Sequence, residues 1–302
     1  MKIAIIGLGK MGSQIARKLH EDKHVVIAYN KTPEATDRMK SLGVLPAYTR
    51  PEVVKLFEGE PAIIWLMIPA DSVEEELQEW LKILPDKSVL IDGGNSDFRL
   101  TQKRSATVLA RGSTLLDIGT SGGIWGYANG FSMMVGGDSE AFKKIEPVLQ
   151  SLAKPSGAYQ HFGESGSGHY VKMVHNAIEY GMMQSLAEGY RLLKEGPYKG
   201  LDLVAAGEVW QHRSVINSWL NELIVNALKE NITLEGVLGK VPESGETRFA
   251  LEVAKEFNIE TPAIQAAFDV RSASQKGNIN FATKLLSLMR NAFGGHTINQ
   301  EK

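Results

Sequence analysis

The sequence predicts an α/β chain in which a doubly wound parallel sheet is followed by an all-helical domain with a long connecting helix. In the first half, short apolar runs alternate with amphipathic segments, which is typical of a parallel sheet with helices on both faces. The glycine pattern Gly7-Leu8-Gly9-Lys10-Met11-Gly12 directly follows the first apolar run, as in Rossmann-type sheets. From Gly168 onward the apolar spacing is helical almost throughout. We therefore expect a dinucleotide-binding domain over residues 1–163 and a helical domain over 164–302.

Composition and charge exclude several classes of protein. The chain has 302 residues, of which 43% are hydrophobic and 23% charged, enough for two cores of about 150 residues each. The formal net charge of −2 argues against a general nucleic-acid or anionic-membrane surface. The absence of cysteine excludes disulfides and thiolate chemistry and fits a reducing compartment. The first apolar run is too short for a signal peptide or a membrane span. We expect a cytoplasmic protein without nucleic-acid or membrane partners, and we predict no metal site.

The first apolar run, the glycines and the amphipathic segment after them predict a strand, a tight turn and a helix. Each glycine has its own reason. Gly7 permits the turn, Gly9 lets the backbone approach a pyrophosphate, and Gly12 lets the helix pack against the strand. The helix N-terminus then faces the phosphates. This context makes residues 7–12 the predicted pyrophosphate site.

The end of the second strand, expected over residues 24–30, indicates which cofactor binds. Enzymes for the unphosphorylated cofactor usually place an acid about 20 residues after the glycines to bind the ribose hydroxyls. Here the strand ends in Asn30-Lys31-Thr32. An amide, a cation and a hydroxyl accommodate a 2′-phosphate without a carboxylate that repels it. We therefore favour NADP, with NAD as the open alternative.

The remaining apolar and amphipathic segments predict the other elements in order. Further strands are expected over 62–68, 88–91, 114–118, 131–135 and 158–162, with helices over 34–42, 73–84, 99–111 and 139–153. A helix of about 27 residues, about 40 Å long, is expected over 168–194. Shorter helices are expected over 202–210, 214–229, 246–257, 262–276 and 281–290.

Two loops follow predicted strands at the edge where ligands bind in such sheets. Asp92-Gly93-Gly94-Asn95-Ser96 ends one strand, although an Asp-Gly turn of purely structural use is the alternative interpretation. The loop from Gly119 to Gly126 exposes several backbone N–H groups and adds the hydroxyls of Thr120 and Ser121. This composition suits a carboxylate.

The long helix is predicted to carry the catalytic groups. At about 100° per residue, Lys172, His175, Asn176 and Glu179 share one face, and Tyr180 lies at its edge. On a helix otherwise rich in Val, Met, Ile and Ala, such a face must either meet solvent or converge on a polar site. The cations Arg248, Arg271 and Arg290 and the base His296 are scattered along the chain. Each taken singly is typical of a surface charge, but the fold could bring them together.

These motifs resemble a known family over nearly the whole chain. Gly7 to Gly12, Gly119 to Gly123 and Gly163 to Asn176 resemble the β-hydroxyacid dehydrogenase superfamily. Within it, the segments 92–96 and 172–180 are similar to the decarboxylating 6-phosphogluconate dehydrogenases. The segment 290–296 resembles that family's C-terminal substrate segment, which in the family reaches into the neighbouring subunit. At 302 residues the chain is similar to a short form without the duplicated helical half.

The resemblance implies an activity and a role for each matching residue. The activity is oxidative decarboxylation of 6-phospho-D-gluconate to D-ribulose 5-phosphate and carbon dioxide, in the pentose phosphate pathway, by a homodimer or homotetramer whose helical domain binds substrate. Lys172 is implied as the base at the C3 hydroxyl and Glu179 as the acid that protonates C1 after carbon dioxide leaves. The implied polar shell around the substrate is Asn95, Ser121, Gly122, Gly123, His175 and Asn176. The implied phosphate clamp is Tyr180, Arg271, Arg290 and His296, the last two from across a dimer interface. The implied cofactor contacts are Gly7, Leu8, Gly9, Lys10, Met11, Gly12, Asn30, Lys31, Thr32 and Asn95.

The chain departs from the family pattern at two places. Lys31 stands where the family has arginine, and lysine keeps the charge but loses the bidentate fork. The long enzymes have Lys-Gly-Thr-Gly-Lys-Trp around the substrate phosphate, where this chain has Ser244-Gly245-Glu246-Thr247-Arg248-Phe249. The roles of that first lysine and the threonine do not transfer, and Arg248 is the nearest substitute.

Two other functions fit parts of the pattern. A non-decarboxylating 3-hydroxyacid dehydrogenase, of the hydroxyisobutyrate or tartronate semialdehyde type, shares Lys172 and Asn176 but has no need of Glu179, Tyr180 or a C-terminal cationic clamp. A nicotinamide-binding sensor needs the pocket but no proton shuttle, so the polar face around Lys172 argues against it.

Overall fold

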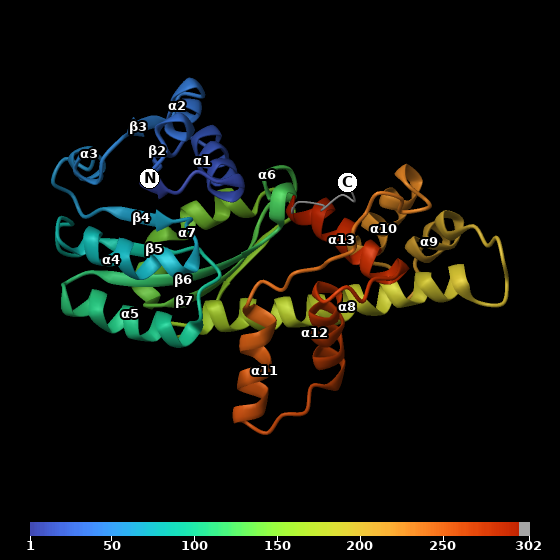
Figure 1. The fold of residues 1–302 in the computed structure, drawn as a ribbon. Helices are drawn as coiled ribbons and strands as arrows, with labels where there is room; N and C mark the ends of the chain where they lie inside the picture. The colour runs from blue at the N-terminus through green and yellow to red at the C-terminus, as the bar shows by residue number, and fades with distance from the viewer. Residues whose placement is uncertain (296–302) are drawn as a thin grey trace. The chain divides into compact units, whose positions relative to one another are not determined.

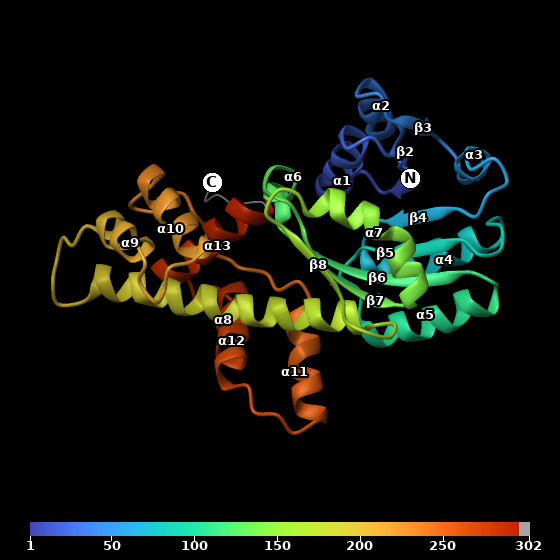
Figure 2. The same cartoon turned by 180° about the vertical axis from the view of Figure 1, so that it is seen from behind.

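The computed structural model describes residues 1–295, and the chain divides into two compact units, Met1–Lys172 and Met173–Lys302. Unit 1 is an α/β sheet domain and unit 2 is all-helical (Figures 1 and 2). Both fold classes expected from the sequence are confirmed. The domain boundary expected near residue 163 stays a prediction.

Unit 1 is built on one eight-stranded sheet in the order β3-β2-β1-β4-β5-β6-β7-β8. The chain moves outward from β1 in one direction and then resumes beside β1 with β4, so the strand order reverses between these two strands. Such a switch point opens a crevice at the carboxyl ends of the strands, where α/β proteins bind ligands. The strands are β1 Lys2–Ile6, β2 Val25–Tyr29, β3 Leu45–Ala47, β4 Ile63–Leu66, β5 Val89–Asp92, β6 Thr114–Ser121, β7 Ser132–Gly137 and β8 Ala158–His161.

The sheet is parallel, as expected, except at one pair. Strand β7 runs antiparallel to β6, with Ile118 opposite Val135. The connection between them holds only the 3₁₀ turn η2 (Gly123–Trp125) and the one-turn helix α6 (Gly126–Asn129). A parallel pair needs a crossover of about a dozen residues or more, usually with a full helix. The glycine-rich loop is therefore a turn between antiparallel strands.

Both faces of the sheet are buried, which explains why its strands are apolar at successive positions. Ile3 and Ile5 of β1 face the cluster that holds α1 and α7, whereas Ala4 and Ile6 face the cluster that holds α4 and α5. Because successive side chains of a strand point to opposite faces of the sheet, β1 contributes residues to two separate cores. The helices of unit 1 are α1 Lys10–Glu21, α2 Pro33–Ser41, α3 Arg50–Lys55, α4 Val73–Leu81, α5 Phe98–Ala110 and α7 Ser139–Ala153, with the 3₁₀ turn η1 at Ala70–Ser72.

One apolar core in unit 2 is formed mainly by side chains of α8, α9, α10 and α13. Tyr190 of α8 donates a hydrogen bond of 2.8 Å to Asn221 of α10, and Asn221 donates one of 3.0 Å to the carbonyl of Gly207 in α9. A buried polar chain thus joins three helices, and burial raises the pKa of Tyr190 to about 12. The helices are α8 Ser167–Glu195, which runs through the division between the units, α9 Leu203–Gln211, α10 Trp219–Glu230, α11 Glu246–Glu256, α12 Pro262–Gln275 and α13 Phe281–Gly294.

Helix α10 begins later than the sequence pattern indicated. The expected start was residue 214, but the helix starts at Trp219 because the side chain of Ser218 caps it by accepting from the N–H of Asn221. A serine at this position satisfies one of the unbonded N–H groups of the first turn. No helix within residues 1–295 is both long and apolar enough to cross a membrane.

Candidate functional site

The glycine turn after β1 has the geometry of a dinucleotide cradle. Gly7 adopts φ of +91°, and a Cβ there would lie 2.5 Å from the carbonyl oxygen of Met67. A Cβ on Gly12 would lie 1.9 Å from the carbonyl oxygen of Gly7, whereas one on Gly9 would meet no protein atom within 4 Å. Helix α1 starts at this turn without a side-chain cap and without an acid in its first turn. The N–H groups and the dipole of such a helix start suit a pyrophosphate, so the residues present fit the cofactor.

Gly7 and Gly12 are packed against backbone atoms, whereas Gly9 faces open space. Substitution by alanine should therefore have different effects at the packed and the open positions. We expect Gly12→Ala to lower the unfolding free energy by about 1–3 kcal/mol or more, because the added methyl group overlaps the turn. Gly9→Ala should leave stability within about 0.5 kcal/mol and still weaken cofactor binding, because its methyl group occupies the open side of the turn. Urea unfolding and titration of NADP or NADPH by protein fluorescence measure the two effects. Loss of stability in Gly9→Ala would contradict this division.

Asn30 at the end of β2 ties the glycine turn to the neighbouring strand. Its Oδ1 accepts from the N–H of Leu8 at 2.9 Å, and its Nδ2 donates to the carbonyl of Thr32 at 3.1 Å. Lys31 and Thr32 are exposed, and Thr32 stands at the start of α2 without making a side-chain cap. The end of β2 therefore offers a cation, a hydroxyl and a helix start, and the acid nearest to them in the helix is the exposed Glu34.

The loop that carries Asn95 is held from below by a buried ionic group. Asp92, at 0% exposure, accepts from the Ser96 hydroxyl at 2.7 Å and from the N–H of Gly94 at 3.1 Å. Arg104 of α5 lies 3.5 Å from the same carboxylate and donates to the Ser96 hydroxyl at 3.2 Å. Asn95 itself is exposed. Both ends of its loop are thus fixed while its side chain remains accessible.

This ionic group should contribute strongly to stability. Removing the charge of one partner of a buried pair leaves the other uncompensated and costs about 3–5 kcal/mol. We expect Arg104→Met to lower the unfolding free energy in urea by about that amount. Glu74→Gln is the matched control, because Glu74 also accepts from Arg104, at 3.1 Å, but its side chain is 58% exposed. That variant should cost less than about 1 kcal/mol, and equal losses in the two variants would refute the buried-pair explanation.

Lys172 is held against the middle of β6 by the start of α8. The buried carboxylate of Asp117 on β6 accepts from the N–H groups of Gly166 and His169, at 2.8 and 2.9 Å. A Cβ on Gly119 would lie 2.2 Å from Cβ and 2.7 Å from Cγ of Lys172. The missing side chain at Gly119 thus makes room for the lysine stem, and Lys172 is only 7% exposed.

The loop after β6 needs glycine at two of its predicted binding positions. Gly122 adopts φ of +123° and Gly123 φ of +52°, conformations that disfavour other residues. Ser121 ends the strand and is half-buried. The backbone of this loop therefore turns sharply at the end of the strand that also carries Gly119.

The polar face of α8 continues into unit 2. Asn176 is 8% and Tyr180 3% exposed, whereas His175 and Glu179 are half-buried. His175 Nδ1 lies 2.9 Å from Oδ1 of Asn176, and because a carbonyl oxygen only accepts, the imidazole donates. The role expected for these residues at one shared site stays a prediction.

Tyr180 belongs to a buried cationic cluster in unit 2. Arg271, at 2% exposure, lies over the Tyr180 ring at 3.2 Å from its centroid, and Arg290 is 8% exposed. Burial lowers the pKa of Arg271 to about 10; the Tyr180 side chain opposes this shift and the Arg290 guanidinium reinforces it. Burial also lowers the pKa of Arg290. Within the described residues neither arginine forms an ion pair with a carboxylate. Two desolvated cations in this state favour an anionic ligand.

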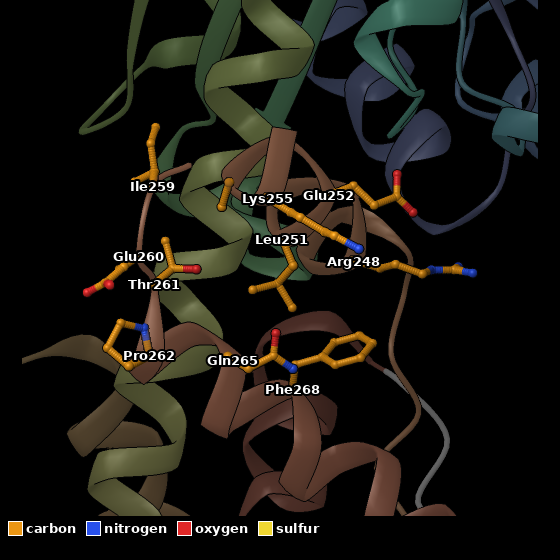
Figure 3. Close-up of a pocket in the computed structure, with 11 residues that line it drawn as sticks. Arg248, Leu251, Glu252, Lys255, Ile259, Glu260, Thr261, Pro262, Gln265 and Phe268 are labelled. Atoms are coloured by element: carbon orange, nitrogen blue, oxygen red, sulfur yellow. The ribbon is translucent and has the colours of Figure 1, made fainter. Parts of the chain in front are cut away.

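Arg248 lies in a different environment. It pairs with Glu243 at 3.1 Å, and its side chain is 54% exposed. Together with Leu251 and Phe268 it lines a cavity of about 650 Å³ between α11 and α12 (Figure 3). This cavity includes none of Tyr180, Arg271 and Arg290. His296, the last expected member of the clamp, lies outside the described residues.

Sequence patterns did not single out the residues that hold the site in place. Arg104 and Asp117 are buried charges within a helix and a strand, and no local motif distinguishes them from surface charges. The available signal was weak: a charge at an apolar-facing position of a predicted buried element.

Comparison with known proteins identifies the family. Residues 2–165 match the family model of the NAD-binding domain of 6-phosphogluconate dehydrogenase, and residues 168–302 match that of its C-terminal domain. With the sheet and the glycine turn, these matches define an NAD(P)-dependent oxidoreductase. The chain belongs to the 6-phosphogluconate dehydrogenase family, as the resemblance in its motifs implied.

Full-length relatives include short-form proteins. The chain is 35% identical to a putative 6-phosphogluconate dehydrogenase, YqeC, of Bacillus subtilis, over 100% of both chains. It is 36% identical to the NAD⁺-dependent, decarboxylating 6-phosphogluconate dehydrogenase of Haloferax volcanii, over 99% of this chain and 98% of that protein.

Solved structures share the fold. The 6-phosphogluconate dehydrogenase of Plasmodium falciparum, described in its apo form and in complexes with NADP⁺ and 6-phosphogluconate, superposes with a TM-score of 0.84 at 26% identity, over 97% of this chain and 70% of that one. The 3-hydroxyisobutyrate dehydrogenase of Mycobacterium tuberculosis has a TM-score of 0.74 at 22% identity, over 95% and 98% of the two chains. The second likeness concerns the fold alone.

Proposed function

We propose that this enzyme oxidises 6-phospho-D-gluconate and releases carbon dioxide to form D-ribulose 5-phosphate. The observation that carries the proposal is the pair of buried arginines, Arg271 and Arg290, which lie without carboxylate partners in the described part of the chain. A simple hydroxyacid dehydrogenase has no dianionic group to place there, whereas a phosphorylated sugar acid has one. Tyr180 completes this proposed phosphate site, and His296 is the proposed fourth member. Because Arg290 interacts with Arg271 and Tyr180 of its own chain, we propose that Arg290 serves the site of the same chain and not, as the resemblance implied, that of a neighbouring subunit.

The proposed roles on α8 follow from what the reaction requires. A bound nicotinamide would supply the acceptor for the hydride from C3. Lys172 takes the C3 hydroxyl proton, so that a β-keto acid forms; a lysine does this where burial or nearby positive charge disfavours its ammonium form. When the carboxylate leaves as carbon dioxide, the electron pair of the broken bond moves to the carbonyl oxygen and an enediolate remains. Glu179 then delivers a proton to the carbon that becomes C1 of the product, while Asn95, Ser121, Gly122, Gly123, His175 and Asn176 hold the polar groups of the substrate.

We propose NADP as the preferred cofactor, because the end of β2 offers Lys31 and Thr32 to a 2′-phosphate and places no acid at Asn30. The single charge of lysine gives less selectivity than an arginine fork. The Haloferax relative is named as NAD⁺-dependent, so the two cofactors belong in the same experiment.

Steady-state rates with 6-phosphogluconate and each cofactor, with carbon dioxide release monitored, test the proposal. We expect one carbon dioxide per cofactor reduced and a higher kcat/KM with NADP. The unphosphorylated substrates run beside it are hydroxyisobutyrate with the oxidised cofactor and tartronate semialdehyde with the reduced cofactor. Cofactor turnover with these substrates and no carbon dioxide would establish the non-decarboxylating alternative. Absence of turnover with every sugar acid would favour the sensor.

Glu179→Gln tests the proposed proton donor without removing the cofactor site or the proposed base. We expect this variant to bind NADP normally and to lose about 100-fold in the rate of product formation, because amide replaces acid at the protonation step. Stopped-flow absorbance of the cofactor and a coupled assay for ribulose 5-phosphate follow the two half-reactions. Near-normal turnover would remove the acid role from Glu179.

We also propose a homodimer or homotetramer. Several large apolar side chains of unit 2 are strongly exposed in the single chain, among them Leu192 at 73% and Val209 at 70%, and such surfaces usually mark contact sites. Light scattering coupled to size-exclusion chromatography gives the mass, and a monomer at micromolar concentration would contradict this proposal.

A further inference from the structure

A buried glutamate next to the arginine cluster has no role in the family pattern carried over above. Glu246, the first residue of α11, is only 4% exposed, and its Oε2 is fully buried without a hydrogen-bond partner within the described residues. The adjacent Thr247 is 0% exposed, and its hydroxyl also has no partner there. A buried carboxylate costs several kcal/mol unless another group compensates it. Glu246 therefore requires a polar partner.

The segment that carries Glu246 is fixed to the arginine cluster. The N–H of Ser244 donates to the Tyr180 hydroxyl at 3.1 Å, and the Ser244 hydroxyl lies 3.3 Å from the same atom. The ring of Tyr180 in turn faces the Arg271 guanidinium at 3.2 Å. The start of α11 thus belongs to the same buried cluster as the proposed phosphate ligands.

Glu246 also acts electrostatically on the second arginine. Its carboxylate is one of the charges that oppose the lowering of the Arg290 pKa by burial, after Tyr180 and Glu179. Yet Glu246 and Arg290 form no ion pair, and neither has a carboxylate or guanidinium partner within the described residues. A buried acceptor and a buried donor that interact electrostatically without forming an ion pair are suited to a group that offers both a hydroxyl and an anion.

We propose that Glu246 is a specificity-determining residue that accepts a hydrogen bond from a hydroxyl next to the phosphate of a phosphorylated polyol. This inference rests on the proposed function. An ionised carboxylate only accepts hydrogen bonds, so it favours a hydroxyl and repels a bare anion. The arginines alone would bind inorganic phosphate as readily as a sugar phosphate. Glu246 makes the site select for a phosphate group that carries a neighbouring hydroxyl, partly because its charge disfavours inorganic phosphate.

The test compares two ligands in one variant. Glu246→Gln keeps the size of the side chain and removes its charge. We expect KM for 6-phosphogluconate to rise and the competitive inhibition constant of inorganic phosphate to fall, so that their ratio increases by about tenfold, as expected for a hydrogen bond to a charged group. Glu256→Gln is the matched control, because it removes one exposed charge from the same helix; its ratio should match that of the wild-type enzyme.

Three outcomes decide the question. An increased ratio with opposite changes for the two ligands supports the proposal. Equal weakening of both ligands would mean that Glu246 only holds Arg290 in place, and unchanged constants for both ligands would mean that it does not contact the ligand; either result overturns the inference. If the wild-type enzyme does not oxidise 6-phosphogluconate, the proposed reaction fails. The shifts in Tm caused by 6-phosphogluconate and by inorganic phosphate then test Glu246 independently.

Discussion

Lys172→Met is expected to lower kcat/KM by about 10³-fold or more while the fold and the affinity for cofactor stay intact. General base catalysis contributes about 10²–10⁴-fold, and methionine matches the lysine stem while lacking the amine. The side chain is buried against β6, and an apolar replacement of similar volume is tolerated there. Steady-state kinetics, a cofactor titration and a urea unfolding curve measure the three quantities. Lys144→Met on the exposed face of α7 is the control and should be unchanged.

Gly119→Ala provides a second route to the same conclusion, with the lysine still present. The new methyl group would lie 2.2 Å from Cβ of Lys172, so the lysine stem must move. A displacement of about 1 Å at a catalytic group costs about 100-fold in rate. We expect kcat to fall by about that factor. If Lys172→Met kept more than a tenth of the activity, the base would have to be another residue, and Gly119→Ala should then have little effect on kcat.

Much of unit 1 could be predicted because its signals are local. The glycines at 7, 9 and 12 have the expected distinct environments. The strands are apolar at successive positions because alternate residues of each strand belong to two different cores. The antiparallel β7 could not be predicted in this way, because strand direction depends on how much chain is available for a crossover. The short β3 and α3 escaped prediction because a few residues give no periodicity.

The site was predictable where chemistry is concentrated in a motif and not where it depends on tertiary contact. Lys172 and Asn176 follow from helical spacing and the resemblance. From the residues alone the arginines were scattered cations, and only the resemblance grouped them with Tyr180 as an implied phosphate clamp. What brings Arg271 against Tyr180 is the packing of α8 with α12, and what leaves Glu246 buried is the path of the chain before α11. A buried charge favours a ligand that compensates it, and whether a charged residue is buried depends on tertiary packing that local sequence does not specify.

Arg271→Met is expected to weaken the use of 6-phosphogluconate without lowering the stability of the fold. We expect kcat/KM for 6-phosphogluconate to fall roughly 10³-fold, because removing one partner of a buried charge pair costs about 2–5 kcal/mol. Stability should not fall. Burial holds the folded-state pKa of Arg271 at about 10, below its value in the unfolded chain, so the charged form opposes folding at every pH below about 10. This opposition, on the order of a few kcal/mol, declines progressively as the pH rises from about 10 to the higher pKa of the unfolded chain.

Methionine removes that opposition and forfeits the contact with the Tyr180 ring, which is worth about 0.5–2 kcal/mol, and the weak hydrogen bond of 3.4 Å that Arg271 donates to the sulfur of Met183. The unfolding free energy of Arg271→Met at neutral pH should therefore equal or exceed that of the wild-type enzyme. Inorganic phosphate or 6-phosphogluconate should raise the Tm of the wild-type enzyme and not that of the variant, because a ligand stabilises only a state that binds it. Arg191→Met is the control, since Arg191 pairs on the surface of α8 with Glu195; its KM and its response to phosphate should not change. A loss of more than about 2 kcal/mol in Arg271→Met would instead make this arginine a structural residue, and an unchanged KM would move the phosphate site elsewhere.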